Sequence, residues 1–323
     1  MKSKRGYLEP IIRPSITSEY PTLQEAQAQI DSIVKNNGRD ESDPKIKVSQ
    51  FPVAKDKYTA YRIDSNQQDK DKTDLVIVYA MGNKGTIAGH YEALKRIFHD
   101  FELFHPNNNI HLVSMDYVGR MTQSDNKQED EFTSYDYSDD GKMLAALIKE
   151  SSDKYGMKNL LVIGHSYGGN AILFANHFLS QEDPGVHAPK MVCSRTFSSS
   201  TNALHEGDKR TTALSIAASN ACLVQDITDD DKIPKFMRLG HDLIKSHAAL
   251  SCEVVQSKLI PDGKSTSPHL THLSNIDIGI SGLSFHLLMK SYYEEKPLKL
   301  YQCAYYTPAT ESMKNILCKR PSH

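Results

Sequence analysis

The sequence predicts an α/β protein with a mostly parallel, twisted sheet and helices on both faces of that sheet. Apolar strands alternate with amphipathic helical segments along the chain, and this alternation is typical of parallel sheets. The strands are continuous apolar runs, such as 75–79 and 160–163, which a sheet covered on both faces requires. The length of 323 residues is enough for one open α/β domain with modest additions.

We expect two regions in the chain, an N-terminal extension over residues 1–44 and an α/β domain over residues 45–323. Thr22 and Glu25 have the spacing of a capping box, and apolar residues then recur on one helical face. The extension is therefore predicted to contain one helix over residues 22–36.

The elements of the α/β domain follow from the period of the apolar residues. The acidic, polar stretch 123–140 has no such period and is expected to form an exposed loop. In chain order we expect an antiparallel strand pair over 45–64 at the sheet edge, a strand at 75–79, a helix from about 90, a strand at 110–115, a helix from about 140, a strand at 160–163, a helix over 171–179, and strands at 190–193, 221–225 and 251–255.

Composition excludes several classes of function. The net charge of −2 gives no electrostatic reason to expect nucleic acid or an anionic membrane as a partner. The five cysteines are widely spaced and form no C-x-x-C pair, which fits neither a disulfide framework nor a zinc site and favours a reducing compartment. No apolar run follows the basic N-terminal residues and none approaches 18 residues in length, so we expect neither a signal peptide nor a transmembrane segment. We therefore expect a cytoplasmic protein, with delivery by a specialised secretion route as the alternative.

One pentapeptide carries the strongest prediction of chemistry. Gly164-His-Ser-Tyr-Gly168 satisfies G-x-S-x-G, and it lies directly after a predicted strand and before the apolar helix 171–179. At average glycine and serine usage, a chain of this length contains on the order of 0.1 such pentapeptides by chance. The turn strains the serine backbone and exposes its hydroxyl, while larger side chains in place of the glycines would collide. Ser166 is therefore predicted to be a nucleophile.

Three motifs together resemble the α/β-hydrolase superfamily, in particular its serine esterases and lipases. Met81-Gly-Asn-Lys-Gly85 follows one predicted strand, Asp116-Tyr-Val-Gly119 follows the next, and the elbow at Ser166 comes third, over residues 70 to 180. The resemblance implies that residues 45–323 form an α/β-hydrolase domain. It also implies that the backbone N–H groups of Asn83 and Tyr167 bind the oxyanion. Met81 departs from the pattern, because the family often has histidine there.

A serine nucleophile needs a histidine base and an acid that orients the histidine. In this fold the chain order is serine, acid, histidine. Asp230 is the preferred acid, because it follows the strand near 221 and resembles the family's Asp-x-x-Val-Pro loop through Pro234. Its neighbours Asp229 and Asp231 remain alternatives. If these aspartates have no catalytic role, we expect them to form a solvated acidic turn at the start of a helix.

The base is expected in the loop after the strand near 254. We prefer His269 and rank His272 second, and either imidazole could instead serve only as a hydrogen-bonding group of the loop. In a rival interpretation Asp262 is the acid and His286 the base, although 286 minus 262 leaves only 24 residues for a helix and a strand. His269 and His272 lack a third ligand motif, so no metal is expected.

The sequence thus predicts a serine hydrolase that cleaves a carboxylic ester, a lipid or a thioester through an acyl-enzyme intermediate. The expected partner is a small-molecule or lipid ester substrate, and no cofactor is required. Two alternatives remain, a non-catalytic binding protein on a hydrolase scaffold and a peptidase. Residues 193–199 resemble a segment of some bacterial hydrolases and fit equally well a polar loop that leaves a strand.

Overall fold

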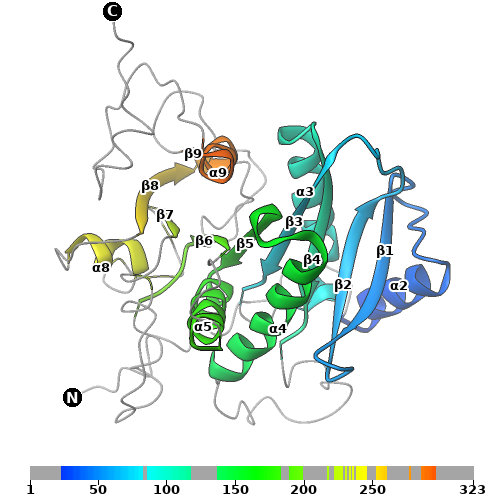
Figure 1. Cartoon of the computed structure of the whole chain (residues 1–323), viewed down its shortest axis with the longest axis horizontal. Coiled ribbons are helices and arrows are strands. Elements are labelled where there is room, and N and C mark those ends of the chain that lie inside the picture. Colours follow the sequence, from blue (N-terminus) through cyan, green and yellow to red (C-terminus); the bar gives the residue numbers. More distant parts are fainter. Residues whose placement is uncertain are drawn as a thin grey trace, which may run out of the picture. The chain divides into compact units, whose positions relative to one another are not determined.

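The computed structural model describes the greater part of the chain and divides it into two compact units (Figure 1). The hairpin unit comprises residues 14–163 and 174–189, and the elbow unit comprises residues 1–13, 164–173 and 190–323. The described residues are 23–82, 86–117, 137–182, 189–198, 217, 222–227, 230, 233, 235, 238–245, 252–259, 276–277 and 285–295.

The elements alternate as the sequence predicts. The hairpin unit contains α2 (Leu23–Lys35), β1 (Ile46–Val53), β2 (Tyr58–Ser65), β3 (Thr73–Ala80), α3 (Ile87–Phe104), β4 (Asn108–Met115), α4 (Tyr137–Tyr155) and a 3₁₀ turn (Met157–Asn159). Strand β5 (Leu160–His165) and helix α5 (Tyr167–Glu182) have residues in both units. The elbow unit contains β6 (Lys190–Ser194), β7 (Leu223–Ile227), α8 (Leu239–Lys245), β8 (Glu253–Leu259), β9 (Ile276–Asp277) and α9 (Phe285–Glu294).

The strands follow one another in the order β1-β2-β4-β3-β5-β6-β7-β8-β9. The pairs β3–β4, β6–β7 and β7–β8 are parallel, while β1–β2, β2–β4 and β8–β9 are antiparallel. A mostly parallel sheet in this order, with a sharp strand-to-helix turn between β5 and α5, is the α/β-hydrolase fold. The predicted fold class and the predicted antiparallel pair at the sheet edge are confirmed.

Helix α2 ends as its sequence predicts. Asn37 has a φ of 57° and Gly38 a φ of 80°, and the Gly38 N–H donates to the carbonyl of Ile33 over 2.9 Å. This bond and the left-handed residue before it are the features of a Schellman cap. A Cβ atom on Gly38 would lie 2.1 Å from the carbonyl oxygen of Val48, so the turn also needs glycine for space. The predicted helix over 22–36 is confirmed to within a residue.

Helices cover both faces of the sheet in the hairpin unit. Successive side chains of a strand point to opposite faces. Tyr61 and Ile63 of β2 line a cavity together with residues of α3, whereas the guanidinium of Arg62, between them, donates to the hydroxyl of Tyr155 in α4 over 3.1 Å. Helices α3 and α4 therefore lie on opposite sides of β2.

The central strands and α3 form the core of the hairpin unit. The last six residues of β3 and of β4 are all buried, and Leu75 pairs with Ile110 in the parallel register. The predicted apolar face of α3 is buried as well, which confirms that face, although the helix begins three residues earlier than expected. Its members are Leu94, Ile97, Phe98 and Phe101.

The end of the acidic stretch was predicted wrongly. Residues 137–140 form the first turn of α4 and not an exposed loop, and residues 123–136 lie outside the described part of the chain. Asp139 and Asp140 occupy this first turn, where the helix dipole favours negative side chains. Among the described residues, no helix is both long and apolar enough to cross a membrane.

Candidate active site

Ser166 is the single residue between β5, which ends at His165, and α5, which begins at Tyr167. Its φ is 54°, in the left-handed region that residues other than glycine seldom adopt. This is the strained strand-to-helix turn that the G-x-S-x-G pattern predicts. The turn is held by backbone bonds, because the Ser166 N–H donates to the carbonyl of Ser194 over 2.9 Å and the Gly169 N–H donates to the carbonyl of Ser166 over 3.1 Å.

The glycines of the elbow are required by close packing. A Cβ atom on Gly164 would lie 2.4 Å from the carbonyl oxygen of Gly168. A Cβ atom on Gly169 would lie 1.8 Å from Oγ1 of Thr196. Neither distance is compatible with any side chain in the present backbone arrangement, so the glycines allow the strand, the turn and Thr196, two residues after β6, to approach one another.

Tyr167, the predicted oxyanion donor next to the nucleophile, is the first residue of α5 and is buried. Its backbone N–H lies at a helix N-terminus, where the peptide dipoles favour a negative charge. This location is suited to the oxygen that becomes negative when a carbonyl is attacked.

The segment after β6 supports the elbow through buried polar groups. The Ser194 hydroxyl donates to Oε1 of Gln225 over 2.7 Å, and Nε of Arg195 donates to the Ser194 hydroxyl over 3.1 Å. The Arg195 backbone N–H donates to the carbonyl of Gln225 over 2.7 Å. All three residues are buried, and the sequence left residues 193–199 open between a hydrolase-like segment and a polar loop that leaves a strand.

Asp230, the preferred acid, lies three residues after the end of β7 and is 8% exposed. Its Oδ1 accepts the backbone N–H of Ile233 over 2.8 Å. The guanidinium of Arg238 donates to the carbonyl of Asp230 over 3.1 Å and to the carbonyl of Ile233 over 2.9 Å. Asp230 therefore caps a turn, as expected if it had no catalytic role, but Asp230 and Ile233 are buried and a buried arginine, Arg238, binds both of their carbonyls.

The loops after β6 and β7 are joined to each other. The Leu239 N–H donates to the carbonyl of Thr196 over 2.8 Å, and Phe197 forms a β-bridge with Arg238. Ser166 follows β5 and Asp230 follows β7, so both come at carboxyl ends of strands in the sheet, where ligands bind in open α/β folds. Backbone contacts thus join the segment after Ser194 to residues 238–239, and the Arg238 side chain continues from there to the carbonyl of Asp230.

Several predicted site residues lie outside the described part of the chain. These are Asn83, Asp229, Asp231, Asp262, His269 and His272. His286 is the second residue of α9, inside a helix. The strand predicted near 221 exists as β7, and β8 is the next strand along the chain and ends at Leu259, so His269 and His272 come after β8 in the chain.

The two sides of the predicted oxyanion loop are braced by the residues after β4, within the hairpin unit. The Tyr117 hydroxyl donates to the carbonyl of Met81 over 2.5 Å. On the other side, Oδ1 of Asp116 accepts the Ile87 N–H over 2.6 Å. Burial raises the pKa of Asp116, and the hydrogen bond from the Ile87 N–H partly opposes this increase. The hydroxyl of Thr86 caps α3 by accepting the Gly89 N–H over 3.0 Å. Despite the departure at Met81, the residues on either side of 83–85 are therefore held by Asp116 and Tyr117.

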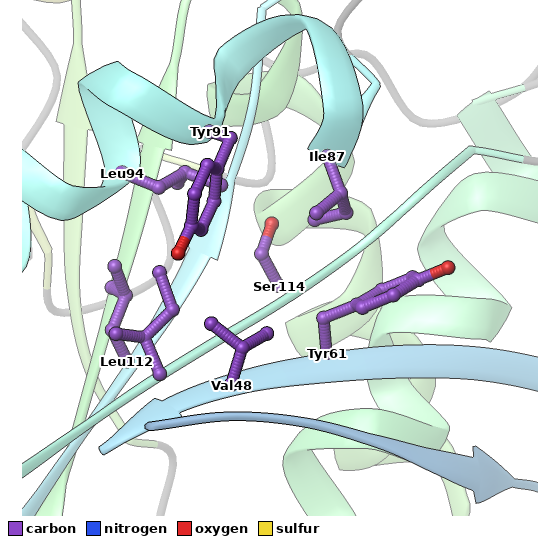
Figure 2. Close-up of a pocket in the computed structure, with 8 residues that line it drawn as sticks. Val48, Tyr61, Ile87, Tyr91, Leu94, Leu112 and Ser114 are labelled. Carbon is purple, nitrogen blue, oxygen red and sulfur yellow. The ribbon is translucent and has the colours of Figure 1, made fainter. Parts of the chain in front are cut away.

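A small cavity in the hairpin unit lies between α3 and strands β1, β2 and β4 (Figure 2). Its volume is about 10 Å³, the space of a single water molecule. Most of its lining is apolar, and Figure 2 shows these side chains surrounding the gap. Such a gap is a packing defect of the core and is too small for an ester substrate. The lining residues are Val48, Tyr61, Ile63, Ile87, Tyr91, Leu94, Leu112 and Ser114.

The three described cysteines behave as small apolar residues. Cys193 lies in β6, while Cys222 and Cys252 directly precede β7 and β8, and all three are buried with free thiols. The pKa of Cys222 is raised chiefly by its hydrogen bond with Cys193, and the pKa of Cys252 chiefly by its hydrogen bond with Cys222. Within the described ranges, no three potential metal ligands come together.

Comparison with known proteins finds no matching family model and no matching curated sequence. Similar solved structures include an esterase/lipase from an uncultured bacterium, with 14% identity, 90% of this chain and 97% of that chain covered, and a TM-score of 0.48. A thermostable esterase from Pseudomonas putida has 11% identity, coverages of 90% and 95%, and a TM-score of 0.49. An esterase from Pyrobaculum calidifontis has 12% identity, coverages of 73% and 81%, and a TM-score of 0.43. The fold of this chain rests on its own strand order and elbow.

Proposed function

We propose that the protein is a serine hydrolase that cleaves a carboxylic ester, including a lipid ester or a thioester, through an acyl-enzyme intermediate. The observation that carries the proposal is the left-handed backbone of Ser166 between β5 and α5. A serine in this conformation is strained, and strain of this kind persists where the surrounding structure enforces it. Buried glycines on either side of the turn and a helix N-terminus directly after it support a nucleophile elbow.

In the proposed mechanism the hydroxyl of Ser166 attacks the carbonyl carbon of the substrate while His269 accepts the hydroxyl proton. The carbonyl oxygen becomes negative and is bound by the backbone N–H groups of Asn83 and Tyr167. His269 then gives its proton to the leaving alcohol or thiol, and the acyl-enzyme remains. Water, deprotonated by His269, hydrolyses the acyl-enzyme and restores Ser166. No cofactor takes part in these steps.

The role of Asp230 is to hold His269 in the tautomer that accepts the proton and to stabilise the imidazolium that forms. Its burial supports this assignment, because a carboxylate screened from water interacts more strongly with a neighbouring charge. The Ile233 N–H on Oδ1 favours the ionised carboxylate that this role requires. The chain order Ser166, Asp230, His269 is the order of this fold.

Replacement of the nucleophile tests the proposal. Ser166→Ala should lower the turnover of a short-chain nitrophenyl ester by about 10⁴ to 10⁶-fold. Ser180→Ala is the matched control, because Ser180 is an exposed serine of the same helix whose hydroxyl bonds only locally, to the carbonyl of His177. Both variants should retain the circular dichroism spectrum and melting temperature of the parent. Turnover that survives in a folded Ser166→Ala protein would exclude Ser166 as the nucleophile.

A further inference from the structure

Arg195 combines two costly features at the end of β6. Its φ is 53°, in the left-handed region, and the residue is only 3% exposed. The left-handed backbone is sterically unfavourable for arginine, and a buried guanidinium loses its hydration. When only the backbone shape matters, glycine or asparagine is the usual residue at such a position. The side chain of Arg195 therefore calls for a separate explanation.

Two contacts of Arg195 lead to Ser194 and to its neighbour on β7, Gln225. The backbone N–H of Arg195 donates to the carbonyl of Gln225, and its Nε donates to the Ser194 hydroxyl, which itself donates to the Gln225 side chain. The left-handed turn thus folds the guanidinium back over the residue that precedes it. Ser194 is held through its side chain from two directions.

Ser194 is also the residue that holds the nucleophile. Its carbonyl accepts the Ser166 N–H over 2.9 Å, and the hydroxyl of Thr196, directly after Arg195, lies 3.5 Å from the same carbonyl. Thr196 also packs against Gly169, where no Cβ atom could fit. A rotation of the Ser194 peptide would therefore shift the backbone of Ser166, and a shift of about 1 Å in a reacting atom can cost 10²-fold in rate.

We propose that Arg195 is a positioning residue for Ser166, which acts by fixing the Ser194 carbonyl that receives the nucleophile's N–H. The inference rests on the proposed function of Ser166. Arg195 makes the elbow rigid through Ser194 and takes no proton and no bond from the substrate. Its loss should therefore lower kcat and leave KM nearly unchanged, because the misplacement affects the attack and not substrate binding.

The substitution Arg195→Gly removes the side chain without straining the backbone, because glycine adopts the left-handed conformation without a steric penalty. Any loss of activity is then due to the missing side chain. The matched control is Lys55→Gly, at an exposed residue with a φ of 54° in the turn between β1 and β2. Both substitutions relieve a strained backbone, but only Arg195→Gly removes a contact to Ser194. Arg195→Asn provides a second variant, since asparagine also tolerates the left-handed region.

The expected result for Arg195→Gly is a kcat at least tenfold below that of the parent for a nitrophenyl ester, with KM within about threefold and a melting temperature within about 4 °C. Arg195→Asn should show the same split, and Lys55→Gly should keep the parental kcat and KM. The inactivation rate constant for a fluorophosphonate should fall in parallel with kcat. A folded Arg195→Gly or Arg195→Asn protein with parental kcat would overturn the inference, and so would a loss confined to KM.

Failure of the proposed function is distinguishable from failure of this inference. Parental protein that neither hydrolyses the ester nor reacts with the fluorophosphonate would remove the proposed function and the positioning role with it. Active parental protein, inactive Ser166→Ala protein and fully active Arg195→Gly protein would remove the positioning role alone. If Arg195→Gly and Arg195→Asn both fail to fold, the role of Arg195 is structural, and the inference is equally wrong.

Discussion

Two residues other than glycine, Ser166 and Arg195, have left-handed backbones at the ends of neighbouring strands in the elbow unit. Each such conformation costs on the order of 1–3 kcal/mol and persists only where its surroundings enforce it. The conformation of Ser166 was predictable, because the G-x-S-x-G pattern is local in the sequence. In the sequence, Arg195 is marked only by the resemblance of residues 193–199 to a segment of some bacterial hydrolases, because its contact with Gln225 joins residues thirty positions apart.

The assignment of acid and base is tested by single substitutions. Asp230→Asn and His269→Ala should each lower kcat/KM by at least about 10³-fold, because the base loses its orientation or is lost altogether. Asp262→Asn and His286→Ala, the matched controls from the rival interpretation, should cost less than about tenfold. Steady-state ester hydrolysis by the four purified variants measures these effects.

The outcomes of these substitutions identify which assignment is wrong. A large effect of Asp262→Asn and His286→Ala alone would transfer the triad to the rival pair. A large effect of His272→Ala in place of His269→Ala would change only the choice of base within the loop after β8. Full activity in all of the variants would remove the triad itself.

At the level of elements, a buried polar cluster ties the segment after α2 to α3 in the hairpin unit. Oδ2 of Asp40 accepts the Tyr91 hydroxyl over 2.8 Å and the Lys95 ammonium over 3.2 Å, and its Oδ1 accepts the Ser42 hydroxyl over 2.6 Å. Burial alone would raise the pKa of Asp40, but the hydrogen bonds from Ser42, Tyr91 and Lys95 outweigh it and lower the pKa to about 2. Asp40 therefore stabilises the contact between this segment and α3 in its ionised form.

Loss of that carboxylate should destabilise the fold. Asp40→Asn should lower the free energy of unfolding at pH 7 by about 2–4 kcal/mol, because Tyr91 and Ser42 lose an ionised acceptor and Lys95 keeps only Glu92 as a carboxylate partner. Asp56→Asn is the control, since Asp56 is exposed in the turn between β1 and β2 and asparagine tolerates its φ of 67°. Urea denaturation followed by circular dichroism measures both variants.

The destabilisation should depend on pH in a defined direction. The folded pKa of Asp40, about 2, lies below its ordinary value of 3.8, so its stabilisation is complete above pH 3.8 and is lost as the pH falls through 2. The difference between parent and Asp40→Asn should therefore be constant from pH 7 to 5 and shrink below pH 4. An equal difference at pH 7 and at the lowest pH where the parent still folds would contradict the role of the ionised carboxylate.

At the scale of the whole molecule, the sequence predicted the strands and long helices because their apolar periods are local. It did not predict β9, which has only two residues, or α8, which has seven, because neither is long enough to show a period. It also missed the start of α4 at Tyr137, because acidic residues of a first helical turn resemble a solvated charge run. Contacts such as the β-bridge between Phe197 and Arg238 join loops that are far apart in the chain and leave no pattern in sequence.

The proposed triad, drawn from three distant parts of the chain, should give ester hydrolysis a single ascending pH profile. An unperturbed histidine has a pKa of about 6.5, and only its neutral form accepts the serine proton. We therefore expect kcat/KM for a nitrophenyl ester to rise with pH through the range of about 6 to 7 and then to level. A flat profile between about pH 5 and pH 9, in buffers of constant ionic strength, would count against a histidine base.

The central claim, that Ser166 is an activated nucleophile, is tested most directly by locating a covalent adduct. The parental protein is treated with a fluorophosphonate and examined by intact-mass spectrometry and peptide mapping. The account predicts one adduct per chain, on the peptide that contains Ser166, with no adduct on the Ser166→Ala protein and an unchanged adduct on the Ser180→Ala control. An adduct on any other residue, or the absence of an adduct on folded parental protein, would contradict it.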